Sequence, residues 1–562
     1  MNNYQPVKHK NILLDLFNIT NIAIYSVLFV YTVILIYIQN GISCDEGYYL
    51  MGYLTNQELG AMVSDFHNII RYFSPDNMQE NVLFFRYFRF VLDFISALLF
   101  GIISYQWLKQ KKDFNLSRIL YLSLILLSAS VSYTYTSPTI SFDHLQHILY
   151  LFTFSFFFAA EILKNKLMRF FSMLFCGYFL VLSIFNYLPS GLLLLFVLLV
   201  FTILQNSKTS VLSKIFIIAI SLLINLSLYH ISITPFHILF ENIMTSIKVA
   251  SDGATKHDNS SLILEMLSAI GLFLSIQTPL FLIGYIYKRI EIHHKILIIF
   301  SVAIILVLML FREIYVIHGY LYYMPISFLW GLYFAKNGFF YKKTQVSEII
   351  FFFIASLLPF IGVFGTNQPV VFKIVIFIPF WSCLFLLLLA KLNLKKSEKN
   401  CLILITIVLY SMGYLYQGSF RQYHSYYTPR SSKYEFTLGE RFKGVKVSSY
   451  EAKYYKTLVE TLKSIGFKSG MTALAFGEQQ IGLYLIGGYF HGPLVYSSGQ
   501  YVKIPNQRAS YIILFRKEEQ SVVDQLVGSG WNFPADYNKI EIGTMAENLD
   551  SENYTTIIYH LK

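Results

Sequence analysis

The stretch Ile19–Ile38, ITNIAIYSVLFVYTVILIYI, decides the fold class of this chain. An apolar helix of about 20 residues is long enough to cross the hydrocarbon core of a bilayer, which is roughly 30 Å thick. The stretch carries no charged residue, and similar apolar runs recur as far as about Gln417. The sequence therefore predicts a polytopic α-helical membrane protein, with the basic segment before Ile19 kept as part of an uncleaved first anchor.

The composition supports this class. Hydrophobic residues make up 55% of the chain and charged residues 14%, whereas charged residues make up about 25% of a typical soluble domain. The formal net charge is +12, but Lys and Arg lie mostly in short segments between apolar runs, where they set membrane orientation. Nucleic acid is therefore not an expected partner. The four cysteines are too few and too scattered to predict a disulfide framework.

The alternation of basic and non-basic connectors predicts about 13 spans with the N-terminus in the cytoplasm. The expected cytoplasmic connectors are rich in Lys and Arg: Lys109–Lys112, Lys164–Arg169, Lys208–Lys214, Lys288–Lys295, Lys336–Lys343 and Lys391–Lys399. The expected outer connectors are poor in both: Gly41–Asn81, Ser137–Asp143, Asn186–Ser190, Thr234–Ser261, Arg312–His318 and Gly365–Pro369. An odd number of spans places the segment after Gln417 outside. A bacterial inner membrane is the simplest location for this arrangement.

Two domains are expected, a membrane domain over residues 1–418, with its first outer loop at 40–85, and an external domain over 419–562. The second has no long apolar run. Glu451–Ile465 and Glu518–Val527 have helical spacing, whereas Thr472–Phe476, Tyr511–Phe515 and Thr555–Tyr559 are short apolar or β-branched runs. This mixture predicts a small α/β domain.

The acidic pair Asp45-Glu46 follows the first span at once, in Cys-Asp-Glu-Gly-Tyr-Tyr. Carboxylates just beyond a span suit a reaction between a lipid-borne and a water-borne substrate, with Asp45 as base. The alternative is that the pair only ends a helix in water. Adjacent side chains rarely share a direction, so Glu46 is expected to point elsewhere and to pair with an Arg. Tyr48 is a candidate for lining a sugar or lipid groove, or for an interfacial aromatic belt.

A second outer carboxylate, Asp143, lies in the short connector before the fourth span. Two carboxylates on neighbouring loops can divide the work of accepting a proton and orienting a substrate, so we expect those of Asp45 and Asp143 within roughly 12 Å of each other at one outward-opening cavity. Asp143 also suits the N-cap of the following helix. His144 is a candidate substrate contact or a polar residue at an interface.

Three arginines lie at outer span ends, where cations are ordinarily sparse. Arg86 and Arg89 begin the second span, and Arg312 ends the ninth. Guanidinium groups bind phosphate through paired, charge-assisted hydrogen bonds, which makes Arg312, and less strongly Arg86, candidates for a lipid phosphate or pyrophosphate. The alternative is pairing with nearby acids or with lipid headgroups.

A divalent metal is a further expectation. His237 and Glu241 are four residues apart and would share one face of a helix, a spacing that permits metal ligation. Two ligands at that spacing also occur on ordinary solvated helices, so the cofactor stays open.

The loop with Asp45-Glu46-Gly47-Tyr48-Tyr49, the second loop with Asp143, and many spans before an external domain resemble the GT-C glycosyltransferases, in layout most of all the protein O-mannosyltransferase-like and lipid A aminoarabinose transferase groups. The resemblance implies Asp45, Glu46 and Asp143 as catalytic residues and a polyprenyl-phosphate-linked sugar as donor. The acceptor would be a glycan, a lipid or a protein on the outer face. Gly319–Pro325 is similar to a tyrosine-and-proline segment near the donor phosphate, which implies substrate contacts for Tyr320 and Tyr323.

Two other classes remain open. A transporter or lipid flippase would also be polytopic, but its ionisable groups should recur near the bilayer midplane. An O-antigen polymerase or ligase also acts on lipid-linked sugars, yet such enzymes carry their large outer loop between late spans. A non-catalytic scaffold would keep its cellular role after Asp45→Ala.

Overall fold

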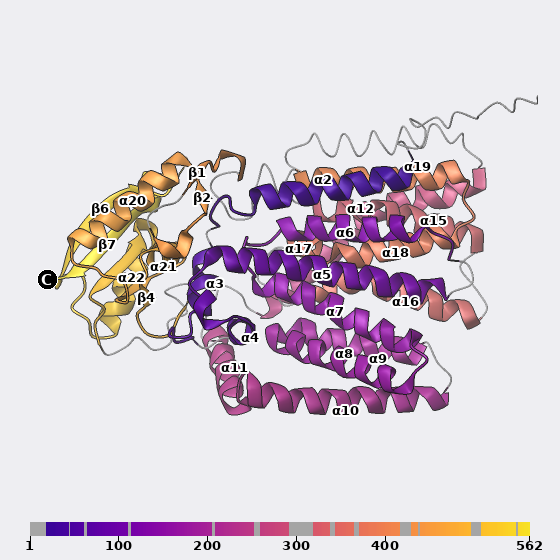
Figure 1. The fold of residues 1–562 in the computed structure, drawn as a ribbon, viewed down its shortest axis with the longest axis horizontal. Coiled ribbons are helices and arrows are strands. Elements are labelled where there is room, and N and C mark those ends of the chain that lie inside the picture. Colours follow the sequence, from indigo (N-terminus) through magenta and orange to yellow (C-terminus); the bar gives the residue numbers. More distant parts are fainter. Residues whose placement is uncertain are drawn as a thin grey trace, which may run out of the picture.

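The structure is a computed structural model that describes residues 18–43, 45–60, 64–110, 114–204, 208–251, 259–290, 318–337, 343–364, 370–415, 429–435, 439–495, 507–546 and 549–562. Most of these residues form long helices that lie side by side, and a small mixed domain sits at one end of the bundle (Figure 1). The chain is therefore a helical membrane protein with a C-terminal α/β domain.

The helices of the bundle run in chain order. They are α2 (Ile19–Tyr37), α5 (Val82–Lys109), α6 (Arg118–Thr134), α7 (Phe142–Ile162), α8 (Lys166–Asn186), α9 (Leu188–Leu204), α10 (Lys208–Ser232), α12 (Asn259–Ile290), α15 (Met324–Asn337), α16 (Lys343–Gly362), α18 (Ile378–Lys391) and α19 (Lys396–Tyr414). Shorter helices join them: α3 (Glu46–Tyr53), α4 (Phe66–Phe73), η1 (Asp76–Met78), α11 (Phe236–Ser251), α14 (His318–Leu321), α17 (Val370–Lys373) and η3 (Ile374–Phe377).

Within the described residues, 7 helical segments are long and apolar enough to cross a membrane, and three shorter apolar helices accompany them. The structure thus supports a multi-pass membrane protein, while the expected number of about 13 spans stays a prediction. The ninth expected span, which ends at Arg312, lies outside the described residues. The most buried spans are α7 and the segment Val370–Lys391, so these two form the centre of the bundle.

Local sequence explains where the helices begin. The side chain of Asn81 accepts a hydrogen bond from the backbone N–H of Phe84 and so caps α5, and Ser141 caps α7 in the same way through the N–H of His144. The alternative expectation that Asp143 caps this helix is therefore wrong, since Ser141 fills that position. Asp143 instead lies in the first turn of α7, where a carboxylate complements the helix dipole.

Small residues let helices approach closely. A Cβ added to Gly331 of α15 would lie 2.0 Å from the carbonyl oxygen of Phe281 in α12, and one added to Gly284 of α12 would lie 2.2 Å from that of Phe328. The two helices therefore meet backbone to backbone, as is common for helix pairs in membranes.

The C-terminal domain is built on a five-stranded sheet with strand order β4-β3-β5-β7-β6. The strands β3 (Thr472–Ala475), β4 (Tyr489–Phe490) and β5 (Tyr511–Phe515) run parallel, and β7 (Thr555–Leu561) and β6 (Tyr537–Thr544) pair antiparallel. The helices of the domain are α20 (Ser449–Ser464), α21 (Gln479–Leu485), α22 (Glu519–Gly528) and α23 (Ser551–Tyr554), with short turns η5 (Pro429–Ser431), η6 (Glu440–Phe442) and η8 (Arg516–Glu518). A separate pair, β1 (Tyr434–Glu435) and β2 (Lys446–Val447), lies between the bundle and the domain.

The first loop is packed between the bundle and this domain (Figure 1). Helix α3 lies so close to α21 that a Cβ on Gly47 would be 2.2 Å from the backbone nitrogen of Ile481. The side-chain amide of Gln57 accepts a hydrogen bond from the N–H of Phe490 at 2.7 Å and donates to the carbonyl of Gly492 at 3.1 Å. The acidic pair and the C-terminal domain therefore share one end of the molecule.

Candidate functional site

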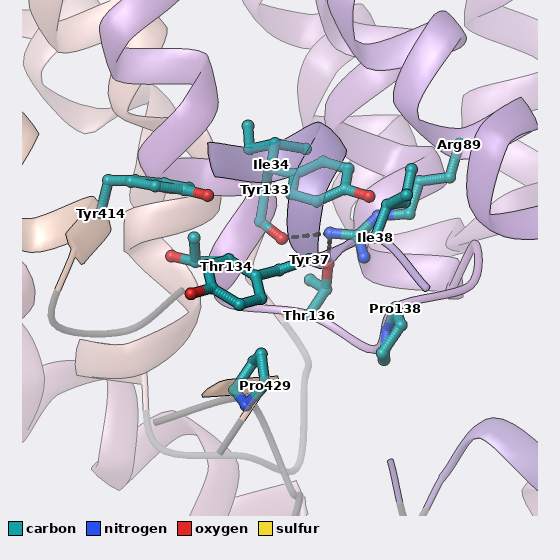
Figure 2. Close-up of a pocket in the computed structure, with 10 residues that line it drawn as sticks. All are labelled: Ile34, Tyr37, Ile38, Arg89, Tyr133, Thr134, Thr136, Pro138, Tyr414 and Pro429. Atoms are coloured by element: carbon teal, nitrogen blue, oxygen red, sulfur yellow. Dashed lines mark hydrogen bonds between the residues drawn. The ribbon is translucent and has the colours of Figure 1, made fainter. Parts of the chain in front are cut away.

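Three charged side chains from three separate elements meet at the domain end of the bundle. Asp143, in the first turn of α7, forms an ion pair with Lys373 at the end of α17. Asp45, which immediately precedes α3, is close enough to Asp143 for the two carboxylates to interact electrostatically. The structure thus brings the two predicted carboxylates together, although neither lines the pocket shown in Figure 2.

Asp45 differs from Asp143 in its exposure. Asp45 is half-buried and, although it occupies the N-cap position of α3, its side chain makes no capping hydrogen bond. The side chain of Asp45 therefore does not cap the helix that it precedes. The side chain of Asp143 is only 10% exposed and its charge is balanced by Lys373. Of the two, Asp45 is the one that a water-borne molecule can reach.

The sequence reasoning missed Lys373. Its side chain is almost fully buried, and its ammonium nitrogen lies 5.1 Å from the centre of the Phe142 ring. The residue follows the Gly365–Pro369 connector that we expected to be external, so the same expectation places it at an outer span end, as it does Arg86 and Arg312. The same rule that singled out those arginines would have found it.

Glu46 points away from Asp45, as expected, and pairs with Arg86. Arg86 donates to both carboxylate oxygens of Glu46, at 2.9 and 2.7 Å, and to the carbonyls of Ile38 and Gly41 at 3.2 and 2.7 Å. Both side chains are fully buried. The guanidinium of Arg86 is therefore already neutralised and fixes the turn between α2 and α3, which does not fit its expected contact with a phosphate.

Arg312 lies outside the described residues, so its expected role stays a prediction. Tyr320 and Tyr323, the two tyrosines expected near the donor phosphate, lie in the bundle core. The hydroxyl of Tyr320 donates to the carbonyl of Ala269 at 2.8 Å, and that of Tyr323 donates to the hydroxyl of Ser356 at 2.5 Å. Both rings are buried, so these side chains hold helices together, and their expected substrate contacts stay a prediction.

Tyr48 packs inside the first loop, with its ring edge-on to His67 at 5.2 Å. Burial raises the pKa of the Tyr48 hydroxyl, which keeps it a neutral donor. The buried Tyr53 donates through its hydroxyl to the carbonyl of Ile140, in the loop before Asp143. This bond ties the loop of Asp45 to that of Asp143, so Tyr53 is structural and does not belong to an interfacial aromatic belt.

His144 faces the interior of the bundle. Its Nε2 lies 3.4 Å from a carboxylate oxygen of Asp93 in α5, and Nε2 of His147 lies 3.6 Å from the same oxygen. The Nδ1 atom of His144 lies within hydrogen-bond distance of the Thr136 hydroxyl, at 3.3 Å. All three charged or titratable side chains are buried. His144 therefore belongs to a buried polar cluster and not to the surface where Asp45 lies.

The two metal candidates, His237 and Glu241, are both exposed on α11. Within the parts of the chain that the structure describes, no group of three or more His, Cys, Asp and Glu side chains could hold a metal ion. The structure therefore gives these two residues no third ligand, and the solvated-helix interpretation is the one that fits them.

A second pocket, of about 610 Å³, lies where the first loop meets the C-terminal domain. Its walls are partly apolar, from residues such as Leu462 and Phe467, and its polar groups include Glu80, Arg441 and Lys463. This volume is within the range of small-molecule sites, about 300–1,000 Å³. A sugar-sized ligand could enter it.

Comparisons with known proteins give no further guide to the function of this arrangement. No family profile, no curated protein and no solved structure matches the chain.

Proposed function

We propose that the protein is a membrane glycosyltransferase that moves a sugar from a polyprenyl-phosphate donor to a glycan, lipid or protein acceptor on the outer face of a bacterial inner membrane. The observation that carries the proposal is the meeting of Asp45, Asp143 and Lys373 at the bundle end that holds the C-terminal domain. A base, a second carboxylate and a cation at a membrane boundary are what transfer from a lipid phosphate requires.

The half-buried Asp45 acts as the base in this scheme. The oxygen of an acceptor hydroxyl attacks the anomeric carbon and forms the new glycosidic bond, while the bond from that carbon to the phosphate oxygen breaks. The proton of the hydroxyl passes to the carboxylate of Asp45. The polyprenyl phosphate leaves with the electron pair of the broken bond and one more negative charge.

Lys373 and Asp143 act on the leaving group. The ammonium of Lys373 carries three N–H donors, so it can hold the departing phosphate while keeping one bond to Asp143. Asp143 in turn fixes the position of the lysine, because a buried ammonium needs a counter-charge. Glu46 is a positioning residue, since its pairing with Arg86 holds the turn that presents Asp45.

The test uses one substitution and a matched control in the same loop. Cells that lack the protein are supplied with the wild-type chain, with Asp45→Asn, or with Glu58→Gln, which changes an exposed carboxylate. Surface glycans and glycolipids are then compared by mass spectrometry. We expect a saccharide that depends on the wild-type chain, survives Glu58→Gln and disappears with Asp45→Asn at equal membrane abundance. An unchanged glycan profile in all three strains would refute the proposal.

A second function, as a transporter or lipid flippase, is favoured by one observation. Asp93, His144 and His147 are ionisable groups buried between spans, and such groups often mark a transport path. Proteoliposomes separate the two functions. Movement of a fluorescent polyprenyl phosphate across the bilayer that stops with Asp93→Asn and continues with Asp45→Asn would favour transport.

A further inference from the structure

A small pocket opens at the domain end of the bundle, between the ends of α2, α6 and α19 (Figure 2). Its volume is about 50 Å³. Since a cavity needs about 10–15 Å³ on this measure to hold one water molecule, the pocket admits a group of a few atoms and not a sugar ring. Its lining includes Arg89, Thr136 and the three tyrosines Tyr37, Tyr133 and Tyr414.

Arg89 supplies an unbalanced positive charge to this pocket. Its guanidinium is 1% exposed and donates only to neutral oxygens, namely the carbonyls of Tyr133 and Ser137 and the hydroxyl of Thr136. None of the ion pairs found among the described residues includes Arg89. The carboxylates of Asp93 and Glu46 act on it electrostatically at longer range, without direct contact. A buried cation without a contacting counter-charge is costly, and this one has an Nε–H that meets no acceptor.

The neighbouring Arg86 shows the contrast. It is buried to the same degree, one helical turn earlier on α5, yet both oxygens of Glu46 neutralise it. No carboxylate among the described residues lines the pocket of Arg89. Arg89 thus differs from Arg86 in that the described residues supply it with no contacting counter-charge.

Tyrosine hydroxyls complete the pocket. Those of Tyr37, Tyr133 and Tyr414 are close enough to interact electrostatically, and Figure 2 shows the hydroxyl of Tyr414 directed toward the centre of the pocket. The ring of Tyr133 also stacks against the guanidinium, whose central carbon lies 4.0 Å from the ring centre. A guanidinium and phenol O–H groups that line one pocket suit an oxygen-rich anion such as phosphate.

The position of the pocket points to a lipid as the source of that anion. The pocket lies at the end of α2, a predicted span whose side chains Leu35 and Ile36 are 49% and 58% exposed. Exposed apolar side chains on a spanning helix face lipid tails. A phosphate seated on Arg89 would therefore lie at headgroup level, with its acyl chains along the outer surface of α2.

We infer that the pocket of Arg89 binds the phosphate group of an anionic membrane lipid. The inference does not depend on the proposed sugar transfer. Binding at this pocket would also affect the loop that leads to Asp143, because Arg89 donates to the carbonyl of Ser137 in that loop. An occupied pocket would hold this loop more firmly.

Native mass spectrometry of the purified full-length protein tests the inference, with short-chain phosphatidylglycerol, short-chain phosphatidylcholine and inorganic phosphate as separate probes. We expect phosphatidylglycerol to bind and Arg89→Gln to weaken it by roughly tenfold or more, as the loss of a charge-assisted contact implies. The matched control is Arg118→Gln, which removes an exposed arginine at the other end of α6 and should leave binding unchanged.

Two conservative variants keep the test valid where Arg89→Gln fails to fold. Tyr37→Phe and Tyr414→Phe remove only a hydroxyl from the pocket and should each weaken phosphatidylglycerol binding several-fold. Equal binding by the wild type and both tyrosine variants would overturn the inference. Equal affinity for phosphatidylcholine and phosphatidylglycerol would overturn the anionic class, and tight binding of inorganic phosphate alone would overturn the assignment to a lipid.

Discussion

The buried pair of Glu46 and Arg86 allows a sharp test of how the first loop is held. Glu46→Gln keeps the shape of the side chain but leaves the guanidinium of Arg86 buried without a counter-charge. Both side chains are 0% exposed, so water does not screen the change. Breaking a buried pair by removing one partner typically costs about 3–5 kcal/mol, whereas an exposed carboxylate in the same loop contributes within about 0.5 kcal/mol. We therefore expect Glu46→Gln to be strongly destabilising and Glu58→Gln to be nearly neutral.

Thermal unfolding in detergent, followed with a thiol-reactive dye, measures this difference. The measurement uses a background that keeps Cys176 as its single cysteine, because this buried thiol reacts only once the bundle opens, whereas Cys383 and Cys401 are half-buried. The double substitution Glu46→Gln with Arg86→Gln should destabilise the protein by less than the sum of the two single changes, because each single change already removes the pair. Equal melting temperatures for Glu46→Gln and Glu58→Gln, or simple additivity in the double variant, would refute the reasoning.

Three other predictions concern packing, pH and topology. Gly47→Ala should loosen the first loop from the C-terminal domain and speed its limited proteolysis, since the new Cβ would meet the backbone of Ile481, whereas Gly528→Ala has open space and should not. Burial raises the pKa of Glu451 from 4.5 to about 7. Its contribution to the free energy of unfolding, up to about 3 kcal/mol, should therefore be present below pH 4.5 and be lost as pH rises through about 7. Unfolding of the C-terminal domain should therefore depend less on pH in this window in Glu451→Gln; an unchanged pH profile would contradict this. In a chain without native cysteines, outside labelling should reach Glu58→Cys and Ser469→Cys but not Lys396→Cys; the reverse pattern would invert the topology.

Patterns that depend on local sequence predicted the fold well. The apolar run Ile19–Ile38 is a helix that ends at Tyr37, and the expected helix Glu451–Ile465 is α20, Ser449–Ser464. The sequence analysis did not predict strands β4 and β6. Tyr489–Phe490 has only two residues, and Tyr537–Thr544 lies at the sheet edge with alternating charged residues, so neither carries an apolar run.

The candidate site was predicted only in part, because local sequence patterns do not show which distant residues contact each other in the fold. The acids Asp45 and Asp143 were found from their position after and before spans. Lys373 is 230 residues from Asp143 along the chain, and nothing local links the two. The same limit explains why Arg86 and Arg89 looked equivalent: their difference arises from Glu46, 40 residues away from Arg86.

The position of Asp45 is fixed from three directions, and this bears on how the C-terminal domain could take part in the reaction. On one side, Glu46 is held by Arg86 of α5. On a second side, the hydroxyl of Tyr53 reaches the loop before Asp143. On the third, the close approach of Gly47 to α21 ties α3 to the C-terminal domain. Because α3 is a short helix that these contacts meet within two turns, a movement of the domain that shifts α21 must either move α3, and with it Asp45, or separate α21 from Gly47. An acceptor that binds between the first loop and the domain can therefore alter the distance from Asp45 to Asp143 without touching either carboxylate.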